Sequence, residues 1–381
     1  MTTTFPAPIR KTWAMVAHAP NTPLVREELD LAAPRDDEVL IEIIASGLCH
    51  TDLSQLEGKA APYPFPVVVG HEGAGIVREV GAKVTSVKVG DHVIPVAIGE
   101  CGQCGNCRSG KTNLCEVFLS EIATQPTPFS LNGERVSAYS GVGSLAQYVV
   151  MNERNVAPIR KDVPFHLACT IGCSVATGVG AVLHTAHVAA GATVAVFGLG
   201  GIGLNVVQGA RLAGASRIIG IDINPMRDAQ GRRFGMTDFI HGAQVTAVEA
   251  IQALTGGGVD FAFECVGNVR LMQQAFDSTR IGWGCTVILG VPADGETMPI
   301  VPFMLQLGRT VKGSFMGNMQ GRSQLPGLLD HYAEGRLNLD DLVTHRLSMA
   351  SVNEGFALMK SGEAVRTVVS FAEDMFKGET A

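Results

Sequence analysis

Four of the nine cysteines of this 381-residue chain stand within fifteen residues of one another. They are Cys101, Cys104, Cys107 and Cys115, in the pattern C-x2-C-x2-C-x7-C. Thiolates at such short spacing can surround one tetrahedral metal ion, each metal–sulfur bond being about 2.3 Å long. A ferredoxin-type iron–sulfur run usually ends in C-x3-C-P, whereas Cys115 is followed by Glu116. The alternative of free thiols or disulfides leaves the pattern without a role. We therefore predict a structural zinc lobe over residues 99–116.

Two further cysteines and a histidine can form a second, open metal site. Cys49 lies in SGLCHTD, His71 in GHEGAG and Cys173 in IGCSVATG. Two thiolates and one imidazole are the ligands of a catalytic zinc whose fourth position is left to water or substrate. Glycines on both sides of His71 permit close backbone packing, and Asp52 can orient the other nitrogen of its ring.

A glycine-rich turn predicts a dinucleotide site. The turn is Gly198-Leu199-Gly200-Gly201-Ile202-Gly203. It follows the apolar run TVAVF and opens a helix-length segment, which places a pyrophosphate at a helix N-terminus. Asp222 ends the next apolar run, 19 residues after Gly203. A carboxylate there binds ribose hydroxyls and repels a 2′-phosphate, which favours NAD over NADP. The alternatives are a tight turn without a ligand and a turn-forming role for Asp222.

The composition describes an ordinary globular protein and excludes several kinds of partner. Hydrophobic residues make up 46% and charged residues 17%, and the length suggests two or three domains, of which we take two as the working number. The net charge is −7 and no basic stripe occurs, so we expect no nucleic acid partner. No apolar run reaches the roughly 18 residues of a membrane span. Nine cysteines are not a secreted disulfide framework. We expect a cytoplasmic protein without membrane association.

The elements that position these groups differ between the two halves of the chain. Residues 39–44 and 67–80 alternate β-branched residues with glycine turns, which is typical of a mostly β region. Beyond about residue 177, apolar runs alternate with helix-length segments, which predicts a parallel, helix-covered sheet. The end of the chain offers two amphipathic helices and the strand-like RTVVSFA, which we expect to rejoin the first domain. The polar segment 116–144 is expected to be a surface loop or an insertion.

With both metal sets and the glycine turn identified, the chain resembles the zinc-dependent medium-chain alcohol dehydrogenases over essentially its full length. The resemblance is carried by GHEGAGIVREVG, KTNLC, VFGLGGIGL, ASRIIGIDIN, GGVDFAFECVGN, GRTVKG and SGEAVRTVV. Several of these segments are most similar to the class III, glutathione-dependent formaldehyde dehydrogenase branch. The resemblance implies an α/β fold: a Rossmann doubly wound parallel sheet at 177–315, and a mostly β, GroES-like catalytic domain split into 1–176 and 316–381. It also implies a homodimer or homotetramer that pairs through the coenzyme domain.

The same resemblance implies two zinc ions per chain, NAD as coenzyme, and a role for each matching residue. Cys49, His71 and Cys173 match the catalytic zinc ligands, and Glu72 matches a transient ligand. Thr51 matches the hydroxyl that begins a proton relay, and Asp52 the partner of His71. Ser54 stands near the position where some relatives end the relay with a histidine, so His50 or water can serve here. The positions that match coenzyme contacts are His50, Thr177, Gly198, Gly200, Gly201, Ile202, Gly203, Asp222, Arg227, Val291 and Arg366.

Departures from the class III pattern bear on the substrate. That branch has acidic residues before GHE and an arginine after the fourth lobe cysteine, whereas this chain has Ala60, Pro62 and Leu119. Ala97 stands where the family often has a bulky aromatic residue. A methyl in place of a ring leaves room for a larger substrate, although other side chains can refill the space. The candidates for refilling it are Tyr139, Ile98 and Phe118.

The predicted activity is reversible hydride transfer between a primary alcohol and NAD, giving the aldehyde. The departures favour a bulky, aryl or allylic alcohol. One alternative is S-(hydroxymethyl)glutathione, the adduct of formaldehyde with glutathione. Another is a non-catalytic dinucleotide-binding module, because fold alone does not establish function.

Overall fold

The computed structural model describes residues 8–59, 63–121, 127–293 and 295–371, which form two compact units. The first unit takes in residues 8–173, 320–333 and 343–371 of the described chain. The second takes in Ser174–Met319 and Glu334–Leu342. Each unit has its own sheets and its own buried core.

The first unit holds two sheets. One is a closed barrel in the order β1-β2-β7-β8-β4, and the other runs β10-β6-β5-β3-β18-β17, with β9 also pairing with β3. The strands of this unit are β1 (Pro8–Ala17), β2 (Val25–Ala32), β3 (Glu38–Gly47), β4 (Val67–Val68), β5 (Glu72–Val80), β6 (His92–Pro95), β7 (Phe129–Leu131), β8 (Glu134–Ala138), β9 (Tyr148–Asn152), β10 (Val156–Ile159), β17 (His345–Ser348) and β18 (Thr367–Ser370). Its α-helices are α1 (His50–Leu56), α2 (Gly105–Arg108), α3 (Glu116–Glu121), α4 (Phe165–Ala168), α11 (Gly321–Ala333) and α12 (Val352–Ser361).

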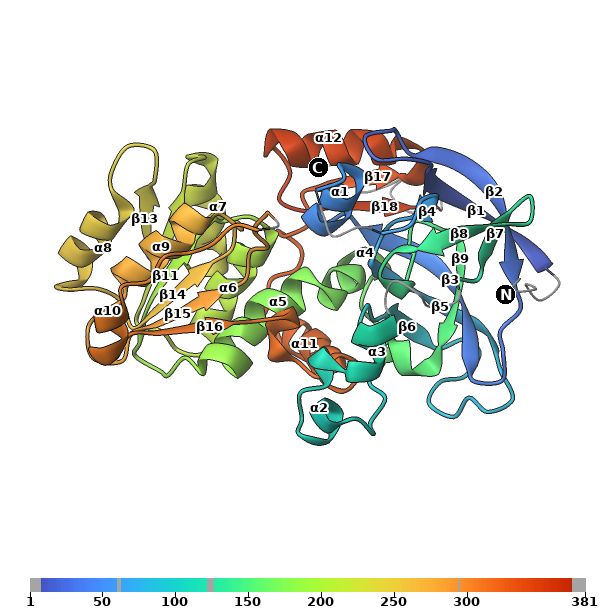
Figure 1. The fold of residues 1–381 in the computed structure, drawn as a ribbon, viewed down its shortest axis with the longest axis horizontal. Coiled ribbons are helices and arrows are strands. Elements are labelled where there is room, and N and C mark those ends of the chain that lie inside the picture. The colour runs from blue at the N-terminus through green and yellow to red at the C-terminus, as the bar shows by residue number, and fades with distance from the viewer. Residues whose placement is uncertain (1–7, 60–62, 122–126, 294, 372–381) are drawn as a thin grey trace. The chain divides into compact units, whose positions relative to one another are not determined.

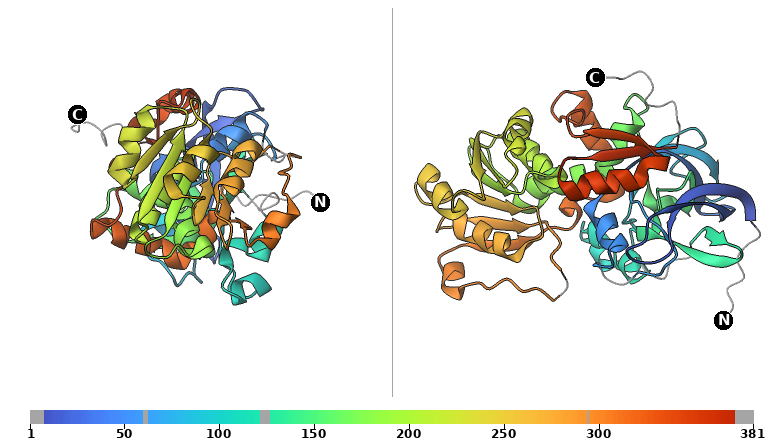
Figure 2. Two further views of the ribbon diagram at one scale, coloured as in Figure 1. Left: turned by 90° about the vertical axis from the view of Figure 1, so that its left-hand side faces the viewer. Right: turned by 90° about the horizontal axis from the view of Figure 1, so that it is seen from above.

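Strand β3 is the centre of the first unit. It pairs antiparallel with β5, β9 and β18. Its sequence EVLIEIIASG is buried at eight of ten positions, which suits a strand covered on both faces. The pairing with β18 brings the end of the chain back to the N-terminal region, and Figure 2 shows the red strands β17 and β18 against the blue part of the same unit.

The expectation of a surface loop or insertion over residues 116–144 is wrong for most of that segment. The structure forms α3 there, followed by the hairpin β7–β8, whose strands belong to the closed barrel. Residues 122–126 lie outside the described residues. The hairpin turns through Asn132 and Gly133, both with positive φ, 53° and 82°. Asn-Gly is the preferred pair for a two-residue hairpin, so the sequence did contain the signal.

The second unit is a six-stranded parallel sheet in the order β13-β12-β11-β14-β15-β16. Figure 1 shows its strands with helices beside them, from green to orange. The elements are α5 (Ser174–Gly180), a π-helix (Ala181–Ala186), β11 (Thr193–Phe197), α6 (Gly201–Leu212), β12 (Arg217–Asp222), α7 (Met226–Phe234), β13 (Asp238–His241), α8 (Ala247–Thr255), β14 (Phe261–Glu264), α9 (Val269–Ser278), β15 (Cys285–Ile288), α10 (Pro302–Gln306) and β16 (Thr310–Gly313).

The core of this unit is built from the apolar runs that predicted it. Phe197, Ile219 and Ile251 belong to one cluster of buried side chains, joining β11, β12 and α8. Because all the strands are parallel, their carboxyl ends meet at one edge of the sheet. The glycine turn and Asp222 both stand at this edge.

The boundaries between the units differ from those predicted. Residues 174–176 and 316–319, predicted to belong to the catalytic domain, are part of the second unit, and so is one longer segment. Residues 334–342 belong to the second unit, whereas the prediction assigned all of 316–381 to the catalytic domain. Two hydrogen bonds tie this segment to α6: Arg211 Nη2 donates to the carbonyl of Arg336 (2.8 Å), and the Asn338 N–H donates to Gln208 Oε1 (2.8 Å).

None of the described helices is by itself both long and apolar enough to cross a membrane. One pair, Phe165–Gly172 with Ser174–Ala186, reaches that length and composition only when its two members are taken together.

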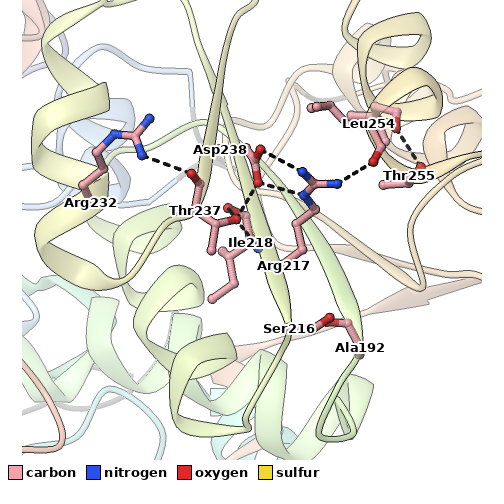
Figure 3. A network of polar contacts seen from close by, with 10 residues as sticks. Ala192, Ser216, Arg217, Ile218, Arg232, Thr237, Asp238, Leu254 and Thr255 are labelled. Carbon is pink, nitrogen blue, oxygen red and sulfur yellow. Dashed lines mark hydrogen bonds and ion pairs between the residues drawn. The ribbon is translucent and has the colours of Figure 1, made fainter.

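A polar network ties β12 to β13 and α8 (Figure 3). Arg217 Nε donates to Asp238 Oδ2 (2.9 Å), and Arg217 Nη1 donates to the carbonyl of Leu254. The hydroxyl of Thr237 donates to the same carboxylate (2.6 Å) and accepts from the Ile218 N–H (3.0 Å). Burial alone would raise the pKa of Asp238, but Thr237 and Arg217 lower it below its usual value.

Asp238→Asn is expected to lower the free energy of unfolding by about 1 kcal/mol, because it weakens two side-chain hydrogen bonds and removes a partly buried ion pair. The pKa of Asp238 is lower in the folded than in the unfolded chain, so its contribution is complete above about pH 4 and is lost only in acid. Urea unfolding should therefore show the same difference from wild type at pH 6 and pH 8.

Asp228→Asn is the matched control. Its partner Arg232 lies four residues away on α7, and both side chains are exposed. Such a pair contributes at most about 0.5 kcal/mol. Equal destabilisation by the two variants would contradict a structural role for the network.

Candidate metal centres and coenzyme site

The four lobe cysteines form one cluster. The sulfurs of Cys101, Cys104, Cys107 and Cys115 all lie within 4.8 Å of one another. The Cys101 and Cys107 sulfurs are 3.8 Å apart, close to the roughly 3.8 Å that a tetrahedron of 2.3 Å zinc–sulfur bonds requires. Helix α2 begins directly after Cys104, so a single short turn presents two of the four thiols. The donor set and its spacing fit a structural zinc ion.

Backbone N–H groups of the lobe stabilise thiolate forms. The N–H groups of Gln103 and Cys104 donate to the Cys101 sulfur at 3.4 and 3.3 Å and lower the pKa of that thiol to about 6. The Cys107 N–H donates to the Cys104 sulfur at 3.4 Å and lowers the pKa of Cys104. Because the thiolate is the form that binds metals, the backbone prepares Cys101 and Cys104 for an ion, whereas burial raises the pKa of Cys107 to about 12.

The second cluster brings together Cys49, His71, Glu72 and Cys173, all buried and all within 4.8 Å by their ligand atoms. The pairing of β3 with β5 explains why Cys49 lies close to His71, because Gly47 opposes Glu72 in the antiparallel register. The chain leaving β3 at Cys49 therefore lies beside the chain entering β5 at His71. Cys173 follows a 3-10 turn (Cys169–Gly172) that packs against β6, the neighbour of β5.

Asp52 orients His71. Asp52 Oδ1 lies 3.0 Å from His71 Nδ1 and also accepts from the Gly70 N–H at 2.9 Å. Both side chains are buried, at 0% exposure for Asp52 and 4% for His71. Burial lowers the pKa of His71, but Asp52 and Cys49 more than reverse this effect. Since Nδ1 faces the carboxylate, Nε2 remains as the nitrogen available to a metal ion.

Glu72 and Arg366 form a buried ion pair beside this cluster. Arg366 Nη1 lies 3.2 Å from Glu72 Oε1 and donates to the carbonyl of Leu48 at 2.7 Å. Burial nevertheless raises the pKa of Glu72 to about 8. Among the described residues, neither oxygen of Glu72 has a partner that meets hydrogen-bond geometry. A Cβ at Gly47 would collide with Glu72 Oε2, so a larger residue there would displace the carboxylate. This carboxylate can therefore serve as an occasional metal ligand.

The predicted glycine turn stands between β11 and α6. Gly198 has φ +89°, in the region that favours glycine. A side chain at Gly203 would collide with the carbonyl oxygen of Gly198, whereas a Cβ on Gly200 would meet nothing within 4 Å. Gly203 thus allows the helix to begin close to the strand, while Gly200 leaves open space in front of the N-terminus of α6. Gly201 and Ile202 supply the first N–H groups of that helix.

Asp222 is fixed at the end of β12. Its Oδ2 accepts from the Leu199 N–H and its Oδ1 from the Asn224 N–H, both at 2.8 Å. The carboxylate is thereby held against the glycine turn. Arg227 is buried in α7 and donates to Gln230 Oε1 at 2.6 Å. Burial lowers the pKa of Arg227, and Asp222 opposes that shift.

The remaining predicted residues are divided between the units. Thr177 lies in α5 with its hydroxyl 4.0 Å from the Met316 sulfur, and Val291 is 82% exposed in the second unit. His50 and Thr51 are exposed at the start of α1, directly after Cys49.

The positions predicted to decide the substrate are only partly described. Ala60 and Pro62 lie outside the described residues. Leu119 is 40% exposed on α3. Ala97 is buried, as are the three side chains that can refill its space. Of these, Tyr139 lies beside the second cluster, its ring centroid 6.3 Å from that of His71 in an edge-on arrangement.

Sequence reasoning missed Glu264, which is fully buried at the end of β14 and accepts three backbone N–H groups. The available signal was a carboxylate at the end of the apolar stretch FAFE in VDFAFECVG, directly before a glycine-containing turn. It also missed the ring contact between Tyr63 and Tyr139, 5.1 Å between centroids, because nothing local links these positions.

Two family models match the chain. The alcohol dehydrogenase GroES-like domain matches residues 35–161, and the zinc-binding dehydrogenase model matches residues 201–334. Among curated relatives, the alcohol dehydrogenase class-3 of Cereibacter sphaeroides is 44% identical over 375 residues, which cover 95% of this chain and 100% of the relative. The S-(hydroxymethyl)glutathione dehydrogenase of Escherichia coli is 46% identical over 369 residues, with the same coverage.

Solved structures agree with these relatives. A zinc-binding alcohol dehydrogenase domain protein from Burkholderia ambifaria superposes with a TM-score of 0.90 at 34% identity, covering 95% of this chain and 99% of its own. Benzyl alcohol dehydrogenase from Acinetobacter calcoaceticus superposes with a TM-score of 0.90 at 30% identity, covering 96% and 100%.

The chain belongs to the zinc-dependent medium-chain alcohol dehydrogenase family, near its class III branch. It is an oxidoreductase of that family, with zinc and a nicotinamide dinucleotide as cofactors. The predicted fold class, a Rossmann sheet with a GroES-like domain and a four-cysteine lobe, is confirmed.

The two clusters should bind zinc independently. Purified wild type is expected to contain two zinc ions per chain, one for each cluster. Cys49→Ser should retain the lobe ion and lose alcohol oxidation. Cys104→Ser should lose the lobe ion and melt at a lower temperature, because a structural zinc contributes directly to folding. Metal analysis by mass spectrometry, with activity and thermal melting, measures all three.

Asp52→Asn and Cys265→Ser complete this set. Asp52→Asn should weaken zinc binding at the second cluster by about 10–100-fold, because it alters the partner that orients His71. Cys265 belongs to neither cluster, so Cys265→Ser should keep both ions. Loss of both ions from Cys49→Ser would contradict independent sites.

Proposed function

We propose that the chain oxidises a primary alcohol to the aldehyde with NAD as hydride acceptor, and catalyses the reverse reaction. The observation that carries the proposal is the buried convergence of Cys49, His71 and Cys173, with Asp52 behind the imidazole. Zinc in that site would lower the pKa of the alcohol and polarise the carbonyl of the aldehyde, and bound NAD would accept the hydride. The non-catalytic alternative has no support, because the donor set is complete.

The side chains around the cluster have separable roles in this reaction. Cys49, His71 and Cys173 hold the ion, and Asp52 keeps His71 in position. The hydroxyl of Thr51, exposed two residues after Cys49, accepts the proton of the alcohol and passes it to His50 or to water. Glu72 is kept ready as an additional ligand by its lack of hydrogen-bond partners.

NAD is proposed over NADP because of Asp222. Its carboxylate is held rigidly by two N–H groups at the end of β12, the position at which an acidic residue binds ribose hydroxyls. A 2′-phosphate there would meet a fixed negative charge.

For the substrate, the relatives favour S-(hydroxymethyl)glutathione. The proteins with 44–46% identity along their whole length have the names alcohol dehydrogenase class-3 and S-(hydroxymethyl)glutathione dehydrogenase. This weighs against the prediction of a bulky alcohol as first choice. We place the glutathione adduct first on the strength of these relatives.

A bulky uncharged alcohol is the second candidate, and residues of this chain favour it. Leu119 offers no charge to a glutathione carboxylate, and Ala97 offers less bulk than an aromatic ring. The structural similarity to a benzyl alcohol dehydrogenase agrees with such a substrate. Tyr139 beside His71 supplies an aromatic surface next to the predicted catalytic ion.

The two candidates are separated by NADH formation with formaldehyde plus glutathione, benzyl alcohol, cinnamyl alcohol and hexanol. If the adduct is the substrate, its kcat/KM should exceed that of each simple alcohol by at least about tenfold, because binding through charged groups is added. Substituting NADP in the same assay should reduce kcat/KM by a similar factor.

Leu119→Arg with Leu119→Gln as control sharpens this test. If the wild type prefers simple alcohols, an arginine at this position should raise activity on the adduct by about tenfold, and glutamine should not. If the wild type already uses the adduct, neither change should raise it. A preference for hexanol over both the adduct and the aryl alcohols would reject both candidates.

We further propose that two copies pair through the edge strand β16. It is the last strand of the parallel sheet and, within the described part of the chain, pairs with a neighbour on one side only. Four exposed apolar side chains lie on α10 or directly beside α10 and β16. They are Val301, Phe303, Leu305 and Phe315, with exposures of 58, 57, 45 and 47%. An open edge with apolar flanks can extend into the same edge of a second copy about a two-fold axis.

We also propose a cytoplasmic location, since none of the nine cysteines forms a disulfide.

Val311→Pro tests the dimer. The Thr310 N–H donates to Gly284 and the Ser314 N–H to Ile288, so the N–H groups that alternate with them, including that of Val311, point away from β15. Proline removes that donor without touching the bonds to β15. Sedimentation should show wild type at twice or four times the chain mass of 40.1 kDa. The dissociation constant of the variant's oligomer should be at least about tenfold higher than that of wild type. Val311→Thr should behave as wild type, and a variant with unchanged mass would refute the edge pairing.

A further inference from the structure

The side chain of Glu264 accepts hydrogen bonds from the backbone of the loop that follows β14. Its Oε1 accepts from the N–H groups of Val266 (2.9 Å), Gly267 (2.9 Å) and Asn268 (3.3 Å). The carboxylate is fully buried, and no lysine or arginine pairs with it in the described part of the chain. Its charge is thus balanced by backbone dipoles, as in an anion-binding nest. Burial raises its pKa, although these N–H groups lower it in part.

The same residue joins this loop to the one that follows β15. The carbonyl of Glu264 accepts from the N–H groups of Leu289 (2.9 Å) and Gly290 (3.1 Å). A Cβ on Gly290 would collide with the backbone of Gly267 and lie 2.7 Å from Glu264 Oε2. A Cβ on Gly267 would collide with the carbonyl of Val291. The two loops therefore touch backbone to backbone, with the carboxylate beside both.

The first loop also touches the glycine turn. A Cβ on Gly198 would collide with the side chain of Val266, and the Cys265 N–H donates to the carbonyl of Phe197 at 2.9 Å. Val266 and Val291 are nevertheless 54% and 82% exposed. Glu264 thus fixes two apolar side chains that face outward next to the predicted pyrophosphate site.

The order of the strands indicates which half of the coenzyme these side chains meet. Asp222, which is predicted to bind the adenosine ribose, ends β12 on one side of β11. Strands β14 and β15 lie on the other side of β11. A dinucleotide lies across this edge with its pyrophosphate at the start of α6, so its second half extends over β14 and β15.

We propose that Glu264 is a positioning residue for the nicotinamide half of the coenzyme. It holds residues 265–268 against residues 289–291, and so keeps Val266 and Val291 in place for the nicotinamide and its ribose. The proposal rests on the proposed use of NAD.

Glu264→Gln tests this role. Glutamine has nearly the same size, but its amide oxygen is a neutral and weaker acceptor than a carboxylate oxygen. Its NH2 group would also replace Oε2, which accepts from the Gly267 N–H at 3.2 Å, so the loops lose part of their anchor. NADH binding, measured by fluorescence, should weaken by about tenfold. AMP, which carries only the adenosine half, should bind within about twofold of wild type by calorimetry. Asp222→Asn should show the other pattern, weakening AMP and NADH together.

Glu249→Gln is the matched control, because it makes the same chemical change at an exposed position of α8 in the same unit. It should change neither affinity. Equal weakening of NADH and AMP by Glu264→Gln, or no weakening of either, would overturn the proposal. A wild type that binds AMP but neither NADH nor NADPH would count against the proposed function instead.

Hydrogen exchange in the unmodified enzyme tests the proposal if Glu264→Gln does not fold. NADH should slow amide exchange in peptides that cover 265–268 and 289–291, and AMP should not. Equal protection by both ligands would place the adenosine half there and would overturn the assignment.

Discussion

Three metal-ligand side chains that are 22 and 102 residues apart in the sequence must lie within one ion's reach, and the first unit is organised around that requirement. The register between β3 and β5, with Gly47 opposite Glu72, places Cys49 beside His71. A slip of two residues would separate the two ligands by roughly 7 Å along the strands. The glycine at position 47 serves the same end, because a side chain there would displace the Glu72 carboxylate.

Buried and partly buried carboxylates do most of the fine positioning, and they do it by accepting backbone N–H groups. Asp52 accepts the Gly70 N–H while it orients His71, and Asp222 accepts those of Leu199 and Asn224. Each thereby fixes a turn and a functional group in one step. A carboxylate without such donors would be costly at these depths. Glu72 is the exception, and its raised pKa shows the cost of burial that Arg366 only partly offsets.

The parts of the site that were predictable are those encoded by short-range patterns. The four-cysteine spacing, the glycine turn and the apolar run before it are local, because one turn or one strand–turn–helix unit produces the geometry. The convergence of Cys49, His71 and Cys173 is set by strand register, so from the residues it was a hypothesis supported mainly by resemblance. Glu264 was missed because its function depends on a neighbouring loop that begins 25 residues later, at Leu289. The hairpin at Asn132-Gly133 was missed for a different reason: a clear turn signal was outweighed by the polarity of the surrounding segment.

The backbone connects the four-cysteine lobe directly to Leu119, the position that we propose to affect substrate choice. Helix α3 begins directly after Cys115, and the Leu119 N–H donates to the carbonyl of Cys115 at 2.9 Å. The lobe therefore sets where Leu119 stands, and Phe118 beside it is buried. An ion that takes no part in the proposed reaction would in this way hold in place a position that we propose to affect substrate choice. Because Leu119 is exposed and makes no bond to either metal cluster through its side chain, the substrate can change there while the metal centres stay as they are. The chain can thus be 44–46% identical to class III relatives and still carry an uncharged residue at a position that we propose to affect substrate choice.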